Sequence, residues 1–503
     1  MDELREARAE LARLEERAKD LLNQLLDVRF AISRQRTKIN EWIRQRPPAI
    51  SRLPNETLSS ILSFDIRAQP YLKRKQHLAS VSRLWRDIIL HDPLLWSLIE
   101  FSGATDFESI KTHLARSNNV PLDIVIRVND CSLDAGSTML SNLEIVASHS
   151  HRWQSLLVDD CTESYHDLSL GDFISDALCD LNFPSLRRVT VPDCRDMSYP
   201  IFLSQARAPA LEYLEFRDYL PSNDFLPVST LKTLVLGLES YYSDDDGHDP
   251  FPLFFSFIPT NALTTLDLRG DNYKWPFQTS SIHFPVLTTL ALTVTHTELV
   301  LQAIVAPILE RFDYNSWDEY HEDNTVFRDF GSTFSSVRHL VIRGGGVNSP
   351  EASLLDEIFP GVRRLELDPE NVPMPFFPLV PLATNNVTHR SYPIDLWNNL
   401  EDLLVRPCSL NWTARSDSFV EWVKQRGNSG TPLHVKLTDI PVTRVTLDYL
   451  LRLYNSLKEC CALEFDVPVK LTSHLVVEAD LLLQQVSTFT IRNINARFIV
   501  ALL

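Results

Sequence analysis

Apolar residues in the first 46 positions recur every three to four residues and predict one long helix. In a heptad reading, position a holds Leu4, Leu11, Ala18, Leu25, Ile32 and Ile39, and position d holds Ala7, Leu14, Leu21, Val28, Gln35 and Trp42. Pro47-Pro48 would end the helix, because proline cannot continue it. At ~1.5 Å per residue, the heptad span from residue 4 to residue 42 would be roughly 58 Å long. We predict a coiled-coil helix over residues 1–46.

The apolar residues at positions a and d form a seam along the predicted helix. The charges that flank this seam do not specify which helix it would pair with. In a parallel homodimer, position g faces the next position e, which here sets Glu10 against Glu15 and Gln24 against Arg29. Neither pair is attractive. An antiparallel pair, a different helix and docking onto the chain's own body therefore compete with the parallel dimer. The basic stretch from Arg29 to Arg46 is a solvated face or a contact for an acidic partner.

A second apolar pattern, over residues 50–98, predicts a compact helical hairpin. Leu58, Ile61 and Leu62 share one helical stripe, and a second helix is expected to carry Leu78, Val81 and Trp85. Residues 65–76, which include Pro70, are expected to form a basic loop between the two helices. About fifty residues cannot bury all these apolar groups alone, so part of the stripe must meet something else.

This segment resembles an F-box of the type common in mushroom-forming fungi. The resemblance is carried by Leu-Pro-x-Glu-x-Leu-x-x-Ile-Leu from Leu53, by Val-Ser-Arg-x-Trp from Val81 and by Pro-x-x-Trp from Pro93. It implies docking onto a Skp-type adaptor and, through it, onto a cullin ubiquitin ligase. An ordinary helical hairpin that caps a larger domain is the alternative. By resemblance, the adaptor-binding residues are Leu53, Pro54, Glu56, Leu58, Ile61, Leu62, Leu78, Val81 and Trp85.

A shorter pattern, apolar-x-x-apolar-x-apolar, occurs ten times between residues 153 and 405, at spacings of 20 to 38 residues. Its last two apolar residues are two apart, as on one face of a short strand. Phe-Pro or Ala-Pro often precedes it, as at Phe183-Pro184 and Phe284-Pro285. These features resemble leucine-rich repeats, in which stacked units bury a continuous core. We predict an irregular solenoid of this kind over residues 101–503.

The same pattern extends in both directions and assigns roles to some cysteines. Strands are expected at residues 121–128, 430–437, 462–467 and 486–491, and a helix at 419–423. Cys161, Cys194 and Cys408 stand eight residues after the first apolar position, where the repeat family buries Asn or Cys in a turn. We expect these three thiols to be structural.

Solenoids present their strands as an extended recognition surface. The outward positions of the predicted strands mix arginine, tyrosine and acidic groups, which suits a protein partner as well as an ordinary polar surface. The candidate target-binding residues are Arg188, Tyr213, Glu215, Asp267, Arg311, Asp313, His339, Arg364 and Glu366.

Composition and charge narrow the classes of partner and the cellular compartment that we expect for this protein. The 503 residues carry a net charge of −18, while residues 1–100 carry +4, so residues 101–503 carry −22. An acidic body disfavours nucleic acid as a partner and would attract a basic protein. We expect no membrane partner and a cytoplasmic or nuclear protein, because no signal peptide or membrane-length apolar run is visible. Seven cysteines without framework spacing suit a reducing compartment.

Motifs for catalysis or cofactor binding do not stand out. The sequence has no phosphate-binding glycine loop, no Gly-x-Ser-x-Gly and no His-Glu-x-x-His. The acidic runs at residues 241–249 and 318–323 lack the ligand spacing of a calcium loop, so solvated insertions explain them better. We expect no enzyme, cofactor or metal site.

Together these patterns predict an α/β protein with a coiled-coil helix (1–46), a helical F-box (50–98) and a leucine-rich-repeat-like solenoid (101–503). The function they favour is substrate recognition for a Skp–cullin–F-box ubiquitin ligase: the F-box docks the adaptor and the solenoid holds a protein target. The alternative is an adaptor-independent scaffold, assembled through the coiled coil, in which the solenoid binds a ligand.

Overall fold

The computed structural model describes residues 2–45, 49–68, 72–127, 133–159, 174, 176–191, 203–217, 229–238, 258–270, 278–315, 334–343, 352–368, 393–406, 416–428, 433–438, 453, 455–457 and 459–466. The chain divides into two compact units. One comprises Met1–Leu98 with Ala115–Asn118, and the other comprises Ile99–Leu114 with Asn119–Leu503. The predicted strand at 486–491 and Cys161, Cys194 and Cys408 lie outside the described residues.

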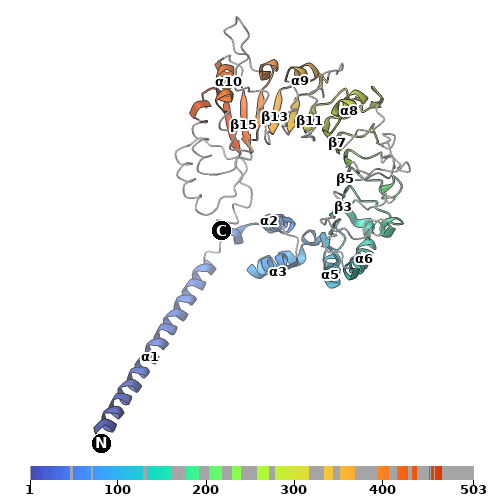
Figure 1. Ribbon diagram of the computed structural model, residues 1–503. Coiled ribbons are helices and arrows are strands. Elements are labelled where there is room, and N and C mark those ends of the chain that lie inside the picture. Colours follow the sequence, from blue (N-terminus) through green and yellow to red (C-terminus); the bar gives the residue numbers. More distant parts are fainter. Residues whose placement is uncertain are drawn as a thin grey trace. The chain divides into compact units, whose positions relative to one another are not determined.

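The first unit begins with a single long helix, α1 (Asp2–Gln45), as predicted (Figure 1). Every side chain described along it is exposed, including the apolar seam. None of the helices in the described part of the chain is long and apolar enough to cross a membrane. In α1 the reason is its charge, since acidic and basic residues alternate with the leucines.

A small helical core follows α1 in the same unit. Its elements are η1 (Ala49–Arg52), α2 (Asn55–Ala68), α3 (Leu72–Val81), α4 (Arg83–His91) and η2 (Pro93–Trp96). The core consists of Leu58, Leu62, Ile66, Leu78, Ile89, Leu95 and Trp96. Trp96 donates its indole N–H to the carbonyl of Ile89 at 2.6 Å, and Ser59 donates to the carboxylate of Asp92. These bonds fasten η2 to α4 and to α2.

The structure corrects two details of the predicted hairpin. The expected second helix is two helices, because the Ser82 hydroxyl accepts a hydrogen bond from the Trp85 N–H and caps a new helix, α4. The expected loop at 65–76 is largely helical, since α2 continues to Ala68 and α3 begins at Leu72. Arg74 donates two hydrogen bonds of 2.7 Å to Asp65, which ties the two helices together.

The second unit is α/β and is built on a large parallel sheet. Its described strands follow one another in the sheet in chain order, and each strand from β2 onward pairs in parallel with the next. They are β1 (Leu98–Phe101), β2 (Leu122–Arg127), β3 (Trp153–Asp159), β4 (Arg188–Val191), β5 (Tyr213–Arg217), β6 (Thr233–Leu238), β7 (Thr265–Gly270), β9 (Thr289–Val294), β11 (Arg311–Asn315), β12 (His339–Arg343), β13 (Arg364–Asp368), β14 (Asp402–Val405), β15 (His434–Thr438) and β16 (Ala462–Asp466).

Helices and a short strand pair accompany this sheet. Figure 1 shows α8, α9 and α10 together on one side of it. The helices are α5 (Phe107–Arg116), α6 (Leu133–Ala147), α8 (Thr297–Ala303), α9 (Ala352–Ile358) and α10 (Ser416–Asn428), with 3-10 turns η3 (Ser150–Arg152) and η6 (Pro393–Leu396). β8 (Ile282–His283) and β10 (Ile304–Val305) form a separate parallel pair.

The repeated apolar pattern explains the sheet. In all ten predicted units the second and third apolar residues lie in a strand and are buried, as Leu290 and Leu292 are in β9. They bury the same face of every strand, because the strands pair in register and side chains alternate between faces. The predicted strands at 121–128, 430–437 and 462–467 correspond to β2, β15 and β16, although residues 430–432 lie outside the described residues, and the helix at 419–423 lies within α10.

The residues before each proline also have a structural role. Phe183, Phe284 and Phe359 are fully buried, and each points into the core one turn before a strand begins. The backbone N–H of Phe183 donates to the carbonyl of Arg207 in the following unit, at 2.8 Å, and Phe284 makes the equivalent bond to Val305. Neighbouring repeats of the sheet are thus joined by backbone hydrogen bonds in the segments before the strands, as well as by the pairing of the strands themselves.

Candidate interaction surfaces

The nine residues assigned to adaptor binding divide into three groups by burial. Leu58, Leu62 and Leu78 lie in the core of the helical unit, and Leu53 and Trp85 are half-buried. A partner cannot contact the first three without opening that core, so their side chains stabilise the fold rather than provide a docking surface. The other four residues are exposed: Pro54, Glu56, Ile61 and Val81.

Helix α2 has a second apolar face that remains in solvent. Leu58, Leu62 and Ile66 recur every four residues and point into the core. Ile61 and Phe64 lie one turn apart on a different face, with 37% and 52% of their surface exposed, and Val81 at the end of α3 is 61% exposed. None of these three side chains belongs to the core of the helical unit. Phe64 was not among the predicted residues, although its spacing from Ile61 in the sequence places it on that face.

The helical unit also buries a lysine. Lys75 of α3 is 1% exposed, and its ammonium lies 4.7 Å from the centre of the Trp96 ring. The Arg116 guanidinium lies 4.5 Å from the centre of the same ring. Burial lowers the pKa of Lys75 to about 7. This lysine therefore changes charge near neutral pH inside the core.

Polar side chains on the outward face of the sheet form rows across the strands. We define row A as the residues in register with His339, row B as those in register with Val341, and row C as those in register with Arg343. Of the predicted target-binding residues, Arg188, Tyr213, Arg311, His339 and Arg364 lie in row A, and Glu215, Asp267, Asp313 and Glu366 lie in row B. All nine predicted target-binding residues therefore lie on one face of one sheet.

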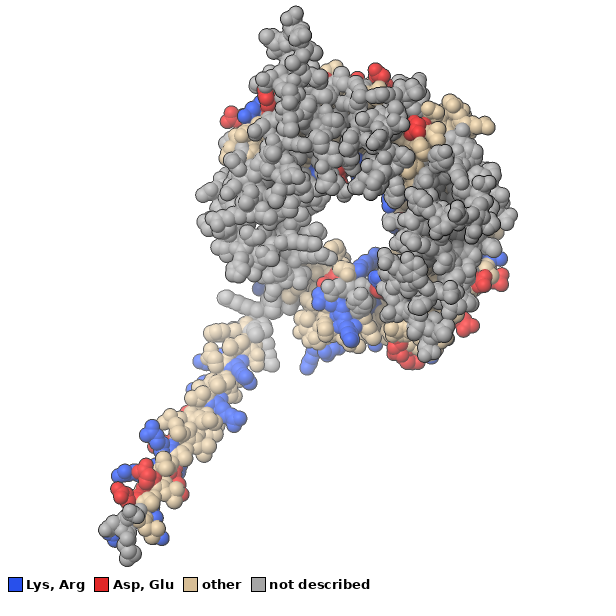
Figure 2. Space-filling model, in the orientation of Figure 1, with Lys and Arg blue, Asp and Glu red and all other residues tan. Residues whose placement is uncertain are grey.

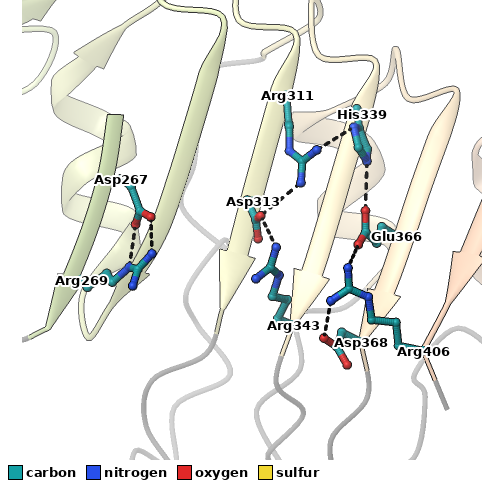
Figure 3. Close-up of polar contacts among 9 residues, drawn as sticks. All are labelled: Asp267, Arg269, Arg311, Asp313, His339, Arg343, Glu366, Asp368 and Arg406. Atoms are coloured by element: carbon teal, nitrogen blue, oxygen red, sulfur yellow. Dashed lines mark hydrogen bonds and ion pairs between the residues drawn. The ribbon is translucent and has the colours of Figure 1, made fainter. Parts of the chain in front are cut away.

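Most of the acidic groups on this face already have basic partners within it (Figure 3). On β7, Arg269 donates two hydrogen bonds to Asp267, of 2.6 and 3.1 Å. Asp313 lies between two guanidinium groups: it accepts from Arg343 at 2.9 Å and from Arg311 at 3.5 Å. Burial nevertheless raises the pKa of Asp313, although both arginines act in the opposite direction.

The most buried part of this network surrounds Glu366. Its side chain is 6% exposed, and it accepts a hydrogen bond of 2.9 Å from Arg406, which also lies 3.5 Å from Asp368. His339 Nε2 lies 3.5 Å from the same carboxylate. The pKa of Glu366 is lowered, most by the contact with His339 and further by the charge of Arg406, against the opposing effect of burial.

A second network occupies the early strands of the sheet. The Tyr213 hydroxyl donates to Glu215 at 2.8 Å, and the Arg188 guanidinium lies 3.9 Å from the centre of the Tyr213 ring. Burial, followed by the bond to Glu215, raises the pKa of Tyr213 to about 12. Glu215 is itself buried, as Glu366 is, so neither carboxylate is open to a partner. Arg188 and Arg364 are the two predicted target residues that are exposed.

The sequence analysis missed the arginines of row C, namely Arg269, Arg343 and Arg406, together with Asp368. Each stands directly after the third apolar position of its unit, which is two residues beyond row B and therefore on the same face. Strand alternation alone would have found them. The three arginines pair with the row B carboxylates Asp267, Asp313 and Glu366.

Other chemistry is sparse in the described parts of the chain. There, no three His, Cys, Asp or Glu side chains are grouped so as to hold a metal ion. Cys179, Cys460 and Cys461 are free thiols, and burial raises the pKa of Cys461 to about 11, which keeps it protonated at neutral pH. No protein-family model matches this chain, and no curated protein matches it either.

Proposed function

We propose that this protein is a substrate-recognition adaptor of a Skp–cullin–F-box ubiquitin ligase. The helical unit would dock a Skp-type adaptor, and the α/β unit would hold a protein to be ubiquitinated. The chain itself would perform no chemistry and would act by bringing target and ligase together. The observation that carries the proposal is the second apolar face of α2, which stays in solvent within the segment that resembles an F-box.

The division of apolar residues in α2 favours docking over a purely structural role. A hairpin that only capped a larger domain would need its buried face, which Leu58 and Leu62 supply. Ile61, Phe64 and Val81 are surplus to that core and remain exposed. Burying an apolar side chain of this kind in a partner contributes about 1.5–3 kcal/mol. A partner with an apolar groove would gain most of its affinity from these three.

For the body, we propose an irregular leucine-rich-repeat-like solenoid. Three features support this fold: parallel strands that follow one another in chain order, the same buried pair in each strand, and buried phenylalanines at the turns before the strands. Arg188 and Arg364 on the strand face are then the described candidates for first contact with a target.

Co-purification tests the adaptor proposal. The full chain is co-expressed with a fungal Skp-type adaptor and compared with Ile61→Asp and Val81→Asp, which place charge at two exposed apolar positions of the helical unit and leave its core intact. Ile308→Asp is the matched control, because Ile308 is a similarly exposed isoleucine on the α/β unit. We expect the wild type and the control to retain the adaptor and both helical-unit variants to lose it.

Two results would contradict the proposal. A well-folded wild type that retains no adaptor removes the ligase function. Equal retention by Ile61→Asp and Val81→Asp removes this docking surface. Leu58→Asp is not a suitable probe, because a charge at a fully buried position would disrupt the helical unit whether or not an adaptor binds.

The second candidate is an adaptor-independent scaffold, assembled through α1, in which the α/β unit binds a ligand. The observation that favours it is the length of the exposed apolar seam of α1. An adaptor that fails to bind, together with self-association of the full chain, is the result expected for a scaffold.

A further inference from the structure

The apolar seam of α1 is exposed along its whole length in the described structure. Its leucines, isoleucines, valine and tryptophan keep between 43% and 63% of their surface exposed. A seam of nearly six heptads without a partner is unstable in water, and isolated helices gain most of their stability from packing such a stripe. The question is which occupant the sequence of α1 specifies.

Charge along α1 is asymmetric. Residues 2–22 carry a net charge of −2, and residues 23–45 carry +3. Figure 2 shows acidic side chains gathered near the N-terminal end of this helix and basic side chains further along it. A second copy in parallel orientation would place like-charged halves together. A second copy in antiparallel orientation places each acidic half beside a basic half. We propose that two copies of this chain associate through α1 as an antiparallel coiled coil.

The packing of the seam favours the same orientation. In a parallel pair each seam residue meets its own copy, so Trp42 faces Trp42 and the layers at Ala7 and Ala18 are thin. In an antiparallel pair with the two helices fully overlapped, position a faces position d. Trp42 then faces Leu4, and the two alanines face Ile39 and Val28. Large residues thus fill the space beside small ones, as close packing requires.

The flanking positions specify the register. In that antiparallel overlap Glu10 faces Lys38 and Glu15 faces Arg29, and each pair occurs twice by symmetry. Leu22 faces Leu22 at the centre. One pair is repulsive, Arg8 against Arg36, and it also occurs twice. A parallel pair sets Glu10 against Glu15 instead, so the two orientations predict opposite effects of reversing the charge at Glu10.

Sedimentation equilibrium of the full chain tests the proposal. We expect a dimer whose dissociation constant rises roughly tenfold in Glu10→Lys, because two attractive pairs become repulsive. Lys38→Glu should have the same effect, and the double variant should restore wild-type affinity. Glu16→Lys is the control: it makes the same charge change outside the seam and flanks, and it should leave the constant unchanged.

Zero-length carbodiimide cross-linking provides an independent test on the wild-type chain. Glu10 and Lys38 are separated by about 42 Å along a single α1, so an amide between them requires a second, antiparallel copy. We expect mass spectrometry to find this cross-link in the covalent dimer. A monomer at all concentrations, tighter association of Glu10→Lys, or a double variant that stays weakened would each overturn the proposal.

Discussion

Replacing Arg406 with methionine tests whether the polar rows stabilise the sheet. Methionine retains an unbranched apolar side chain, shorter than that of arginine, and removes the hydrogen bond of 2.9 Å to Glu366. Removing one partner of a fully buried ion pair costs about 3–5 kcal/mol. Here Arg406 is one-third exposed and His339 remains near the carboxylate, so we expect a loss of about 2 kcal/mol at neutral pH.

Hydrogen exchange is the suitable assay, because a long sheet of successive units need not unfold in one step. Peptides that cover β13 and β14 should exchange roughly thirtyfold faster in the variant, which is the equivalent of about 2 kcal/mol. The matched control is Arg363→Met, because Arg363 pairs with Glu401 at 3.5 Å on the exposed surface. Such pairs contribute about 0–1 kcal/mol, so the control should lose little protection.

The pH dependence of Arg406→Met follows from the pKa of Glu366. A lowered pKa means that the ionised carboxylate stabilises the folded state above the ordinary pKa, and that this contribution is lost as the pH falls through the lowered value. Without Arg406 the pKa of Glu366 rises, so the difference between variant and wild type should shrink under acid conditions. Adding Glu366→Gln to the Arg406→Met variant should restore part of the protection against hydrogen exchange, because it removes the carboxylate that has lost its partner. Equal losses in Arg406→Met and Arg363→Met would refute the structural role of these rows.

Two further predictions concern the cores. The pKa of Lys75 is lowered in the folded state, so the unfolded state binds more protons above pH 7. The free energy of unfolding of the helical unit should therefore rise with pH up to about 10.4, by at most about 1.4 kcal/mol for each pH unit. Lys75→Met should abolish that slope in thermal unfolding followed by tryptophan fluorescence, and an unchanged slope would contradict the assignment. Gly427→Ala should lower the melting temperature, because the added Cβ would lie 2.5 Å from the Cys460 carbonyl oxygen; a higher melting temperature, as helix propensity alone predicts, would show that α10 shifts freely.

The sequence predicted the strands well because their pattern depends on local geometry. An apolar pair two residues apart is sufficient to place a strand and its buried face, and all ten units obeyed this rule. The helical unit was harder. A single serine, Ser82, divides the expected second helix by capping a new one, and a continuous apolar spacing does not reveal such a break. The sequence also could not predict which apolar residues of α2 are buried. Leu58 and Ile61 are both apolar, and only the packing of the folded helices buries one and exposes the other.

Charge balance on the strand face bears on how a target would be recognised. The acidic residues Asp267, Asp313, Glu366 and Asp368 are matched by Arg269, Arg311, Arg343 and Arg406, so this cluster is neutral overall.

The net charge of −22 on residues 101–503 must therefore be carried elsewhere, and the two acidic runs of the sequence, 241–249 and 318–323, fall outside the described residues. Long-range attraction of a basic target would act through such charges, while the paired rows would fix the shape of the sheet. Variants in the paired rows should then change stability first. Variants at exposed Arg188 and Arg364 should change target binding without loss of protection in the sheet.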